Sequence, residues 1–376
     1  MSTPMPPIQE RTLPALIRRR LESKFKKPSR GPQTPAASRP VGVGLIGAGN
    51  FARWSYVPRL KQGFPFKLAA VFDVNQEGAK QVADSLGARA YTSVADLLKD
   101  EGVEAVFVCT PVKHHFDAVQ AALAAKKHVL CEKPLGYDYR EARTLFAEAR
   151  KAGTMHMVHF SHRFIPELAY LADLIHAGVV GQVYHITGSF SQGFWFTDKN
   201  EPAQDRDDAA PWKFGADGGV VQDLGPHLID CCRMTFGEIS RVQAWTKSFR
   251  PGPFVTDDAC GLSLTFTNGA VAQLITSRWA TGQKHRIALE ISGSLGTVIL
   301  NDGSIRLWTR AEPRWRTLLV PPLQTGNFLE TFYSALIDPK VKLPDFWDGL
   351  KNNEALEAIM RSAKTGTAVK LPLEPA

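Results

Sequence analysis

The glycine-rich segment that follows the first apolar run constrains the fold more than any other feature of this sequence. Residues 43–52 read Val-Gly-Leu-Ile-Gly-Ala-Gly-Asn-Phe-Ala, so that Gly47, Gly49 and Ala52 form a G-x-G-x-x-A pattern. In such a pattern the first glycine permits a tight turn, the second lets a pyrophosphate approach the backbone, and the small third residue lets a helix pack closely on a strand. It predicts a dinucleotide site at a helix N-terminus, formed by Gly47, Ala48, Gly49, Asn50, Phe51 and Ala52.

Because glycine turns are common, this pattern needs support from its surroundings. Short apolar runs alternate with helical patterns between residues 41 and 160, which predicts a Rossmann domain with a doubly wound parallel sheet. The strand candidates are 41–46, 68–72, 105–109, 128–131 and 156–160, and the helix candidates are 77–86, 114–125 and 140–152.

The pattern changes after residue 160. Helices are expected at 167–177 and 224–236, and alternating strands rich in Thr, Ser, Val and Trp fill residues 241–310. We therefore expect an α/β protein whose C-terminal α+β domain, residues 161–345, is built on a large open, mostly antiparallel sheet. Residues 346–376 contain a further helix, expected at 349–364, which is expected to return to the Rossmann domain.

The net charge of +8 raises the question of nucleic-acid binding. Residues 1–40 carry nine Lys and Arg against two Glu, a balance of +7, and the other 336 residues carry 36 basic and 35 acidic groups, a balance of +1. The excess lies in a proline-rich extension that is expected to be flexible, and no nucleic-acid partner is expected for the folded body.

The remaining composition points to a cytoplasmic enzyme. No apolar run approaches the roughly 20 residues that cross a bilayer. The five cysteines form no CxxC pair and no zinc-type cluster with histidine, so we expect a reducing compartment and no metal site.

A carboxylate supports the dinucleotide site and bears on the choice of cofactor. Asp73 lies 21 residues after Ala52, at the end of the second predicted strand, where an acceptor for the ribose 2′-hydroxyl is expected. The next three residues, Val-Asn-Gln, offer no basic group for a 2′-phosphate. NAD is therefore favoured over NADP, although a more distant lysine able to fold over a 2′-phosphate leaves NADP open.

Two further strand ends carry polar motifs: Thr110-Pro111 with His115 four residues after the proline, and Glu132-Lys133-Pro134. Open α/β sheets bind ligands at the carboxyl ends of their strands. A lysine at such a position, beside a proline that fixes the chain, is expected to hold a positive charge near a bound nicotinamide.

These motifs resemble those of the Gfo/Idh/MocA oxidoreductase family. The matching segments are Thr110-Pro111 with His115, the run 128–135, His162-Arg163-Phe164, Gly218-Gly219 with the run 223–230, and the run 362–366. They occur in order from about Val41 to Pro372, and the histidine at 227 is similar to that of the inositol and glycoside dehydrogenase branches.

The resemblance implies that Lys133, Asp223 and His227 act on a ring hydroxyl of a sugar, glycoside or inositol-like polyol. It also implies that Thr110, Pro111, His115, Glu132 and Lys133 contribute to the cofactor site. A homodimer or homotetramer built on the open sheet is expected as well.

Elementary chemistry supports the same three residues. Oxidation of a secondary alcohol needs a proton acceptor on the hydroxyl while hydride leaves the same carbon. Imidazole titrates near neutral pH, so His227, expected in the first turn of its helix, is the natural acceptor. Asp223 is expected at the N-cap of that helix and Lys133 at the reacting oxygen, where it would stabilise an alkoxide.

The substrate side is less constrained by the sequence. Arg163, in the segment that resembles the family's domain junction, is a candidate substrate residue, although it could equally hold the domains together. Trp195 and Trp212 lie on a long loop whose aromatic rings suit the apolar faces of a sugar. A catalytically silent NAD-binding sugar sensor of the same fold is the alternative function, but such a protein has no reason to retain Lys133, Asp223 and His227 together.

Overall fold

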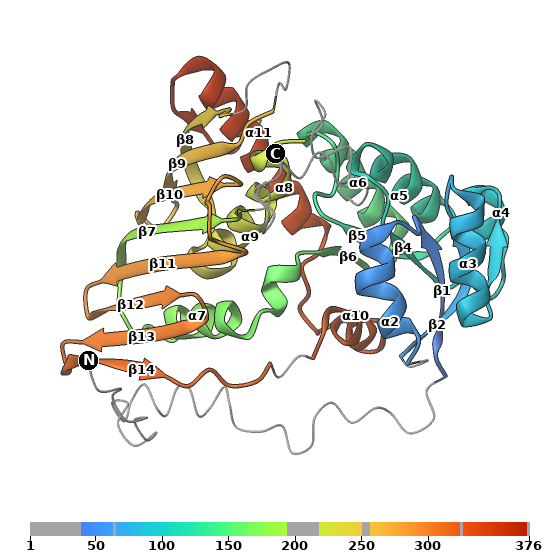
Figure 1. The fold of residues 1–376 in the computed structure, drawn as a ribbon, viewed down its shortest axis with the longest axis horizontal. Helices are drawn as coiled ribbons and strands as arrows, with labels where there is room; N and C mark the ends of the chain where they lie inside the picture. The colour runs from blue at the N-terminus through green and yellow to red at the C-terminus, as the bar shows by residue number, and fades with distance from the viewer. Residues whose placement is uncertain (1–38, 63–64, 194–217, 250–255, 324–325, 374–376) are drawn as a thin grey trace. The chain divides into compact units, whose positions relative to one another are not determined.

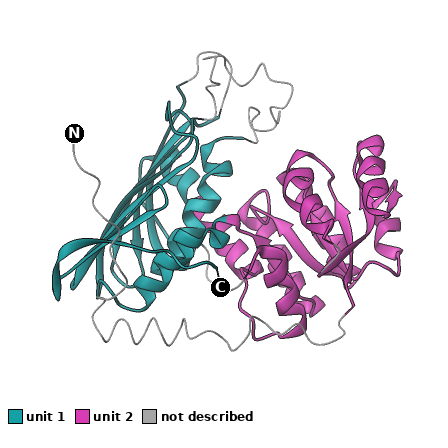
Figure 2. Cartoon of the chain, turned by 60° about the horizontal axis from the view of Figure 1, so that its bottom comes forward, with its two compact units in different colours: residues 1–30, 162–323, 358–376 teal, residues 31–161, 324–357 magenta. Residues whose placement is uncertain are grey.

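The computed structural model describes residues 39–62, 65–193, 218–249, 256–323 and 326–373 (Figure 1). The chain divides into two compact units, coloured in Figure 2. The parallel-sheet unit holds the described residues of 31–161 and 324–357, and the nine-stranded unit holds those of 162–323 and 358–376.

The parallel-sheet unit is built on six strands in the order β3-β2-β1-β4-β5-β6, all paired in parallel. The order reverses between β1 and β4, which is where doubly wound sheets bind their ligands. The strands are β1 (Val41–Ile46), β2 (Phe66–Phe72), β3 (Arg89–Tyr91), β4 (Ala105–Val108), β5 (His128–Glu132) and β6 (His156–His159).

Three helices of this unit, α3, α6 and α10, begin at residues whose side chains accept backbone N–H groups of the first turn. Asn75 and Asp138 accept backbone N–H bonds at the starts of α3 and α6, and a capping box of Asn327 and Glu330 begins α10. Gly87 and Gly153 end α3 and α6 in the left-handed conformation. The elements are η1 (Ala52–Tyr56), a π-helical turn, α2 (Val57–Leu60), α3 (Gln76–Leu86), α4 (Val94–Lys99), η2 (Val112–His114), α5 (His115–Ala124), α6 (Tyr139–Ala152), α10 (Phe328–Ile337) and the first part of α11 (Phe346–Thr365).

The expected α/β architecture is confirmed, with differences at the element ends. The strand expected at 68–72 begins two residues earlier, at Phe66. β3 and α4 were not predicted from the sequence. β3 has only three residues, of which Arg89 and Ala90 are exposed, and α4 has only six residues, so neither shows a long apolar pattern.

Aromatic packing places α10 in the parallel-sheet unit. Phe332 of α10 lies 6.0 Å from Phe66 of β2 and 6.2 Å from Phe107 of β4, between ring centroids. Phe346, at the start of α11, belongs to the buried core and donates its N–H to His156. Residues 326–345, which were expected in the second domain, therefore belong to the parallel-sheet unit.

The nine-stranded unit contains a mostly antiparallel sheet in the order β14-β13-β12-β11-β7-β10-β9-β8-β15, in which only β7 and β10 pair in parallel. This agrees with the expected open antiparallel sheet. Its strands are β7 (Val183–Ser191), β8 (Ile239–Lys247), β9 (Ala259–Phe266), β10 (Val271–Ser277), β11 (Arg286–Gly293), β12 (Gly296–Asn301), β13 (Ser304–Thr309), β14 (Glu312–Leu318) and β15 (Val369–Lys370).

Helices pack on one face of this sheet (Figure 2). They are η3 (Ser161–Phe164), α7 (Pro166–His176), α8 (Val220–Asp223) and α9 (Gly225–Phe236). The strands alternate accordingly: in β10, Ala272 and Leu274 are buried toward the helices, and Val271 and Ile275 are exposed on the other face. In the described part of the chain, no helix is long and apolar enough to cross a membrane.

Candidate active site

The glycine-rich turn after β1 has the geometry that a pyrophosphate requires. Gly47 has a φ of +94°, and a Cβ there would lie 2.7 Å from the carbonyl carbon of Cys109 and the amide nitrogen of Thr110. A Cβ on Gly49 would meet no atom within 4 Å, so this glycine borders open space. Ala52 is fully buried beneath the turn. The arrangement leaves room for a dinucleotide where the fingerprint predicts one.

Asp73 lies directly beside this turn. Its Oδ2 accepts the N–H of Ala48 at 2.6 Å, and its Oδ1 accepts the N–H of Asn75 at 2.8 Å. A carboxylate offers about four acceptor positions, so the half-buried Asp73 retains capacity for ribose hydroxyls.

Arg53 is a residue of this region that the sequence analysis missed. Its Nε donates to the carbonyl of Ala48 and its Nη2 to the carbonyl of Gly78, both at 2.9 Å. Arg53 therefore ties the glycine-rich turn to the first turn of α3. Its place four residues after Gly49 was the available signal.

His115 joins the ends of β4 and β5. Its Nδ1 lies 2.8 Å from the carbonyl oxygen of Pro134, and its Nε2 lies 2.9 Å from that of Thr110. Burial is the main reason that the pKa of His115 lies below its usual value. The imidazole thus links the loop that follows β4 to the loop that follows β5.

The Thr110 hydroxyl differs from the Thr110 carbonyl, which contacts His115. Its Oγ1 is buried and has no hydrogen-bond partner among the described residues. A buried hydroxyl in this state is suited to a ligand's polar group. This hydroxyl and the open space at Gly49 are two features of this unit that are compatible with a bound dinucleotide.

Glu132 is the centre of a buried polar cluster below Lys133. Its Oε1 accepts the Tyr56 hydroxyl and lies beside Nδ1 of His159, each at 2.6 Å. Burial opposes ionisation of Glu132, but the charge of His159 and the hydrogen bonds from His159 and Tyr56 outweigh it, so the pKa of Glu132 is lowered. Burial, reinforced by that carboxylate, raises the pKa of Tyr56 well above its usual value. Glu132 therefore braces the end of β5 against η1.

Lys133 follows the last residue of β5 and is half-buried, and its peptide bond with Pro134 is cis. A second residue missed in the sequence supports the loop that follows. Asn353 of α11 donates Nδ2–H to the carbonyl of Gly136 at 2.7 Å and accepts the N–H of Gly136 at 3.4 Å. Lys133 therefore lies at the start of a loop that the side chain of Asn353 holds in place three residues later, at Gly136.

Asp223 and His227 lie in the nine-stranded unit on two consecutive helices. His227 is in the first turn of α9, as expected, and is half-buried. The expected N-cap role of Asp223 is wrong. Asp223 is the last residue of α8, and Leu224, with helical backbone angles, stands at the N-cap position without a side-chain bond.

The reason for this difference lies in Pro226 and Asp257. Pro226 has no N–H for the carbonyl of Gln222, which interrupts an otherwise continuous helix between α8 and α9. Asp257 performs the capping at the start of α8: its carbonyl accepts the N–H of Val220 at 2.9 Å, and its Oδ2 accepts that of Val221 at 2.8 Å.

The carboxylate of Asp223 is held by an arginine that the sequence analysis missed. Nη2 of Arg278 lies 2.8 Å from Oδ2 of Asp223 and donates to the carbonyl of Gly219 at 2.9 Å. Arg278 is only 1% exposed and Asp223 8%. A buried charge pair of this kind fixes the rotamer of Asp223, four residues before His227.

His227 belongs to a compact cluster of rings. Its imidazole stacks on that of His162, with centroids 4.1 Å apart and planes inclined by 23°. Phe190 and His285 contact His162 edge-on at 5.0 and 5.3 Å. Burial lowers the pKa of His285.

Arg163 lies next to His162 and is paired with α9. Its Nε and Nη2 form a bidentate bond to Asp230, at 2.8 and 2.6 Å, and Asp230 has no exposed surface. The other two candidate substrate residues, Trp195 and Trp212, lie outside the described residues. Among the residues that the structure describes, no group of three His, Cys, Asp or Glu side chains is arranged to hold a metal ion.

The predicted residues thus form two groups, one in each unit. The glycine-rich turn, Asp73, Thr110 and Lys133 lie at the carboxyl ends of β1, β2, β4 and β5, and Asp223 and His227 lie on α8 and α9.

Comparison with known proteins decides the family. Residues 41–160 match the model of an oxidoreductase family with an NAD-binding Rossmann fold, and residues 168–299 match that of the GFO/IDH/MocA C-terminal domain. The chain belongs to the Gfo/Idh/MocA oxidoreductase family. The resemblance read from the motifs is confirmed, and so is the expected NAD-binding Rossmann domain.

Named relatives of this oxidoreductase act on sugars and inositol. The levoglucosan dehydrogenase of Pseudarthrobacter phenanthrenivorans is 27% identical over 290 residues, which cover 69% of this chain and 72% of that protein. The myo-inositol 2-dehydrogenase of Thermotoga maritima is 28% identical over 276 residues, which cover 69% and 75%. A solved structure of levoglucosan dehydrogenase in complex with NADH and L-sorbose shares the fold, with a TM-score of 0.77 and 24% identity over 89% of this chain and 99% of that chain.

Proposed function

We propose that this oxidoreductase interconverts a secondary ring hydroxyl and a ketone on a sugar, glycoside or inositol-like polyol, with His227 as the acid/base. The observation that carries the proposal is that buried residues hold the side chains of both Asp223 and His227 in place. Asp223 is paired with the buried Arg278, and His227 is stacked on the buried His162. The names of the relatives, a levoglucosan and a myo-inositol dehydrogenase, support the substrate class.

The proposed reaction assigns one task to each side chain. The imidazole of His227 accepts the proton of the substrate hydroxyl, while Lys133 donates a hydrogen bond to the same oxygen and stabilises its developing negative charge. Asp223, fixed by Arg278, accepts a bond from a substrate hydroxyl and orients the ring. Bound NAD supplies the hydride acceptor, so that the carbon loses one hydride and its oxygen one proton, which leaves a ketone.

The cofactor would be held by the parallel-sheet unit. The glycine-rich turn from Gly47 to Ala52 and the hydroxyl of Thr110 would bind its phosphates and neighbouring groups, and Asp73 would accept the ribose hydroxyls. Pro111, Glu132 and His115 shape and brace the loops around it. NAD is preferred to NADP because a carboxylate at position 73 repels a 2′-phosphate.

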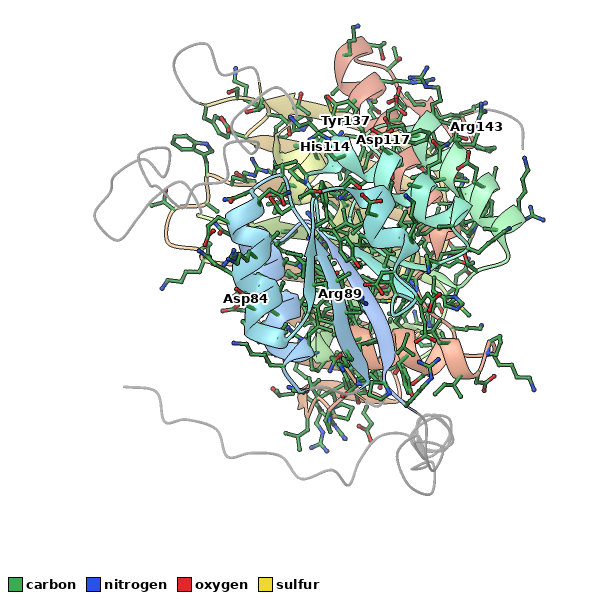
Figure 3. All side chains as sticks on the ribbon, turned by 90° about the vertical axis from the view of Figure 1, so that its right-hand side faces the viewer. Asp84, Arg89, His114, Asp117, Tyr137 and Arg143 are labelled. Atoms are coloured by element: carbon green, nitrogen blue, oxygen red, sulfur yellow. The ribbon has the colours of Figure 1, made fainter. Side chains whose placement is uncertain are left out.

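Replacing Asp73 with Ala tests this preference. We expect kcat/KM for NAD to fall about 10-fold or more and that for NADP to fall less or to rise, because only NAD carries the free 2′-hydroxyl and only NADP the 2′-phosphate that the carboxylate repels. The lost bonds to the N–H groups of Ala48 and Asn75 affect both cofactors alike. Initial rates with both cofactors measure the two values. Asp84→Ala, at an exposed position of α3 labelled in Figure 3, is the control and should leave both values unchanged. Equal losses for NAD and NADP would contradict the assignment.

The outer face of the nine-stranded sheet is proposed as the interface of a homodimer or homotetramer. Trp245, Gly261 and Ile275 form one cross-strand row on β8, β9 and β10, and Trp245 and Ile275 are 50% and 41% exposed. Exposed apolar rows on a sheet face are typical of interaction surfaces. Light scattering on the protein with Trp245→Glu and Ile275→Lys together should give a monomer, and an unchanged mass would contradict this interface.

The activity itself is tested by a substrate panel. Levoglucosan, myo-inositol, D-glucose, D-xylose and methyl glucosides are each offered with NAD and with NADP, and formation of the reduced nicotinamide is followed by absorbance. Turnover of at least one cyclic polyol supports the proposal. Tight binding of NADH without turnover of any compound would favour a silent sugar sensor.

A further inference from the structure

The residues that hold His227 in place come from one short segment, η3. His162 and Arg163 are consecutive in the sequence, and each contacts a different residue of α9: His162 stacks on His227, and Arg163 pairs with Asp230. Residues three apart share one face of a helix. The two contacts therefore lie on the same face of α9, about one helical turn apart.

The stacking contact decides the orientation of the catalytic ring. Rotation of an imidazole about χ2 is only weakly restricted by its own backbone, so neighbouring groups must define it. His162 is 5% exposed and lies parallel to His227, whereas Phe190, 1% exposed, meets both rings edge-on at 5.0 and 6.3 Å. The flat face of His162 and the edge-on contact with Phe190 together favour a single ring plane for His227.

The supports of His162 are themselves fixed. His285 packs against the edge of His162 at 5.3 Å and against Phe190 at 4.9 Å, and its Nδ1 is hydrogen-bonded to the side chain of Gln192 at 3.0 Å. The bidentate Arg163–Asp230 pair anchors the backbone next to His162. Rigid support of this kind is what a catalytic group needs, because a small misplacement costs a large factor in rate.

From these contacts we infer that His162 is a positioning residue for the proton acceptor His227, and that it acts through the flat face of its ring. The inference rests on the proposed function of His227. It also gives Arg163 a role beside His162: it holds the segment against α9, in place of the substrate contact considered from the sequence.

Three substitutions separate the flat face from the ring nitrogens. His162→Phe keeps a ring that can stack, His162→Leu fills similar space without a flat face, and His162→Ala removes the support. With the panel sugar that gives the highest kcat/KM, we expect kcat of the Phe variant within about 3-fold of wild type, and that of the Leu and Ala variants lower by about 10- to 100-fold. The KM for the sugar and the Kd for NADH should change by less than about 3-fold.

Two further readouts exclude a general loss of structure. A substrate deuterated at the reacting carbon should give a larger isotope effect on kcat in the Leu variant, because the chemical step has slowed. Crystal structures should show one ring plane for His227 in the wild type and the Phe variant and several in the Leu variant, a result that needs no substrate. The control is His156→Ala, which removes another histidine stacked on an aromatic ring, Phe346 at 4.7 Å, and should lower stability but not kcat.

The outcomes distinguish this inference from the proposed function. A Leu variant with wild-type kcat, or a Phe variant as slow as the Ala variant, would overturn the inference; the second result would show that the ring nitrogens are needed. If His227→Ala itself keeps wild-type kcat, the proposed function fails. Adding His162→Leu to His227→Ala should cause no further loss, because both changes act through one group.

Discussion

His227→Ala is expected to lower kcat by about 10²- to 10⁴-fold, the range typical of a lost general acid/base. The affinity for NADH should stay within about 3-fold, because His227 belongs to the nine-stranded unit and the dinucleotide fingerprint to the other. Steady-state rates with the best panel sugar and fluorescence titration with NADH measure the two effects.

A second histidine of the same unit provides the control for this prediction. His176 is exposed at the C-terminal end of α7, and His176→Ala should leave both kcat and NADH binding unchanged. A His227→Ala enzyme with at least a third of wild-type kcat would contradict the role of His227 as proton acceptor.

Arg278→Met is expected to destabilise the protein by about 3–5 kcal/mol, the cost of leaving a buried charge without its partner. Arg278 and Asp223 are 1% and 8% exposed and their charged atoms lie 2.8 Å apart, so methionine would leave the carboxylate and the carbonyl of Gly219 without this donor. The free energy of unfolding in guanidinium chloride measures the effect.

The double-mutant cycle makes this prediction specific. The loss of unfolding free energy in the double variant Asp223→Asn with Arg278→Met should be smaller than the sum of the losses in the two single variants. The reason is that the amide removes the negative charge that Arg278→Met alone leaves buried without a partner. The exposed Arg241 of β8 serves as control, and Arg241→Met should change the free energy by no more than about 0.5 kcal/mol. Additive losses in the cycle would show that the pair is not coupled.

The fold was largely predictable from the sequence because the strands of the parallel sheet are covered on both faces. Such strands read as unbroken apolar runs, and β1 was expected at the residues where it occurs. β3 escaped prediction because its short, mostly exposed sequence carries no such run. The glycine-rich turn was predictable because the positive φ of Gly47 and its close approach to the backbone of Cys109 and Thr110 require glycine at that position.

The candidate site was predictable only in part, for a different reason. Sequence motifs indicate the residues that are expected to contact ligands. The residues that hold those side chains in place lie far away in the sequence and belong to no motif. Arg278 lies 55 positions after Asp223, and His162 lies 65 positions before His227, so no local pattern links either pair. The N-cap expected at Asp223 was wrong because the helical segment already begins at Val220, as α8, and the first turn of α8 is capped by Asp257, which the chain reaches 34 residues after Asp223.

The proposed reaction requires above all that Lys133 and His227 act on the hydroxyl of one reacting carbon. A crystal structure of the enzyme with NADH and the best panel sugar tests it directly. We expect one substrate hydroxyl within hydrogen-bond distance of both Nζ of Lys133 and a ring nitrogen of His227, with the nicotinamide ring facing its carbon. A substrate bound to only one of the two side chains, with the other directed into a separate cavity, would contradict it.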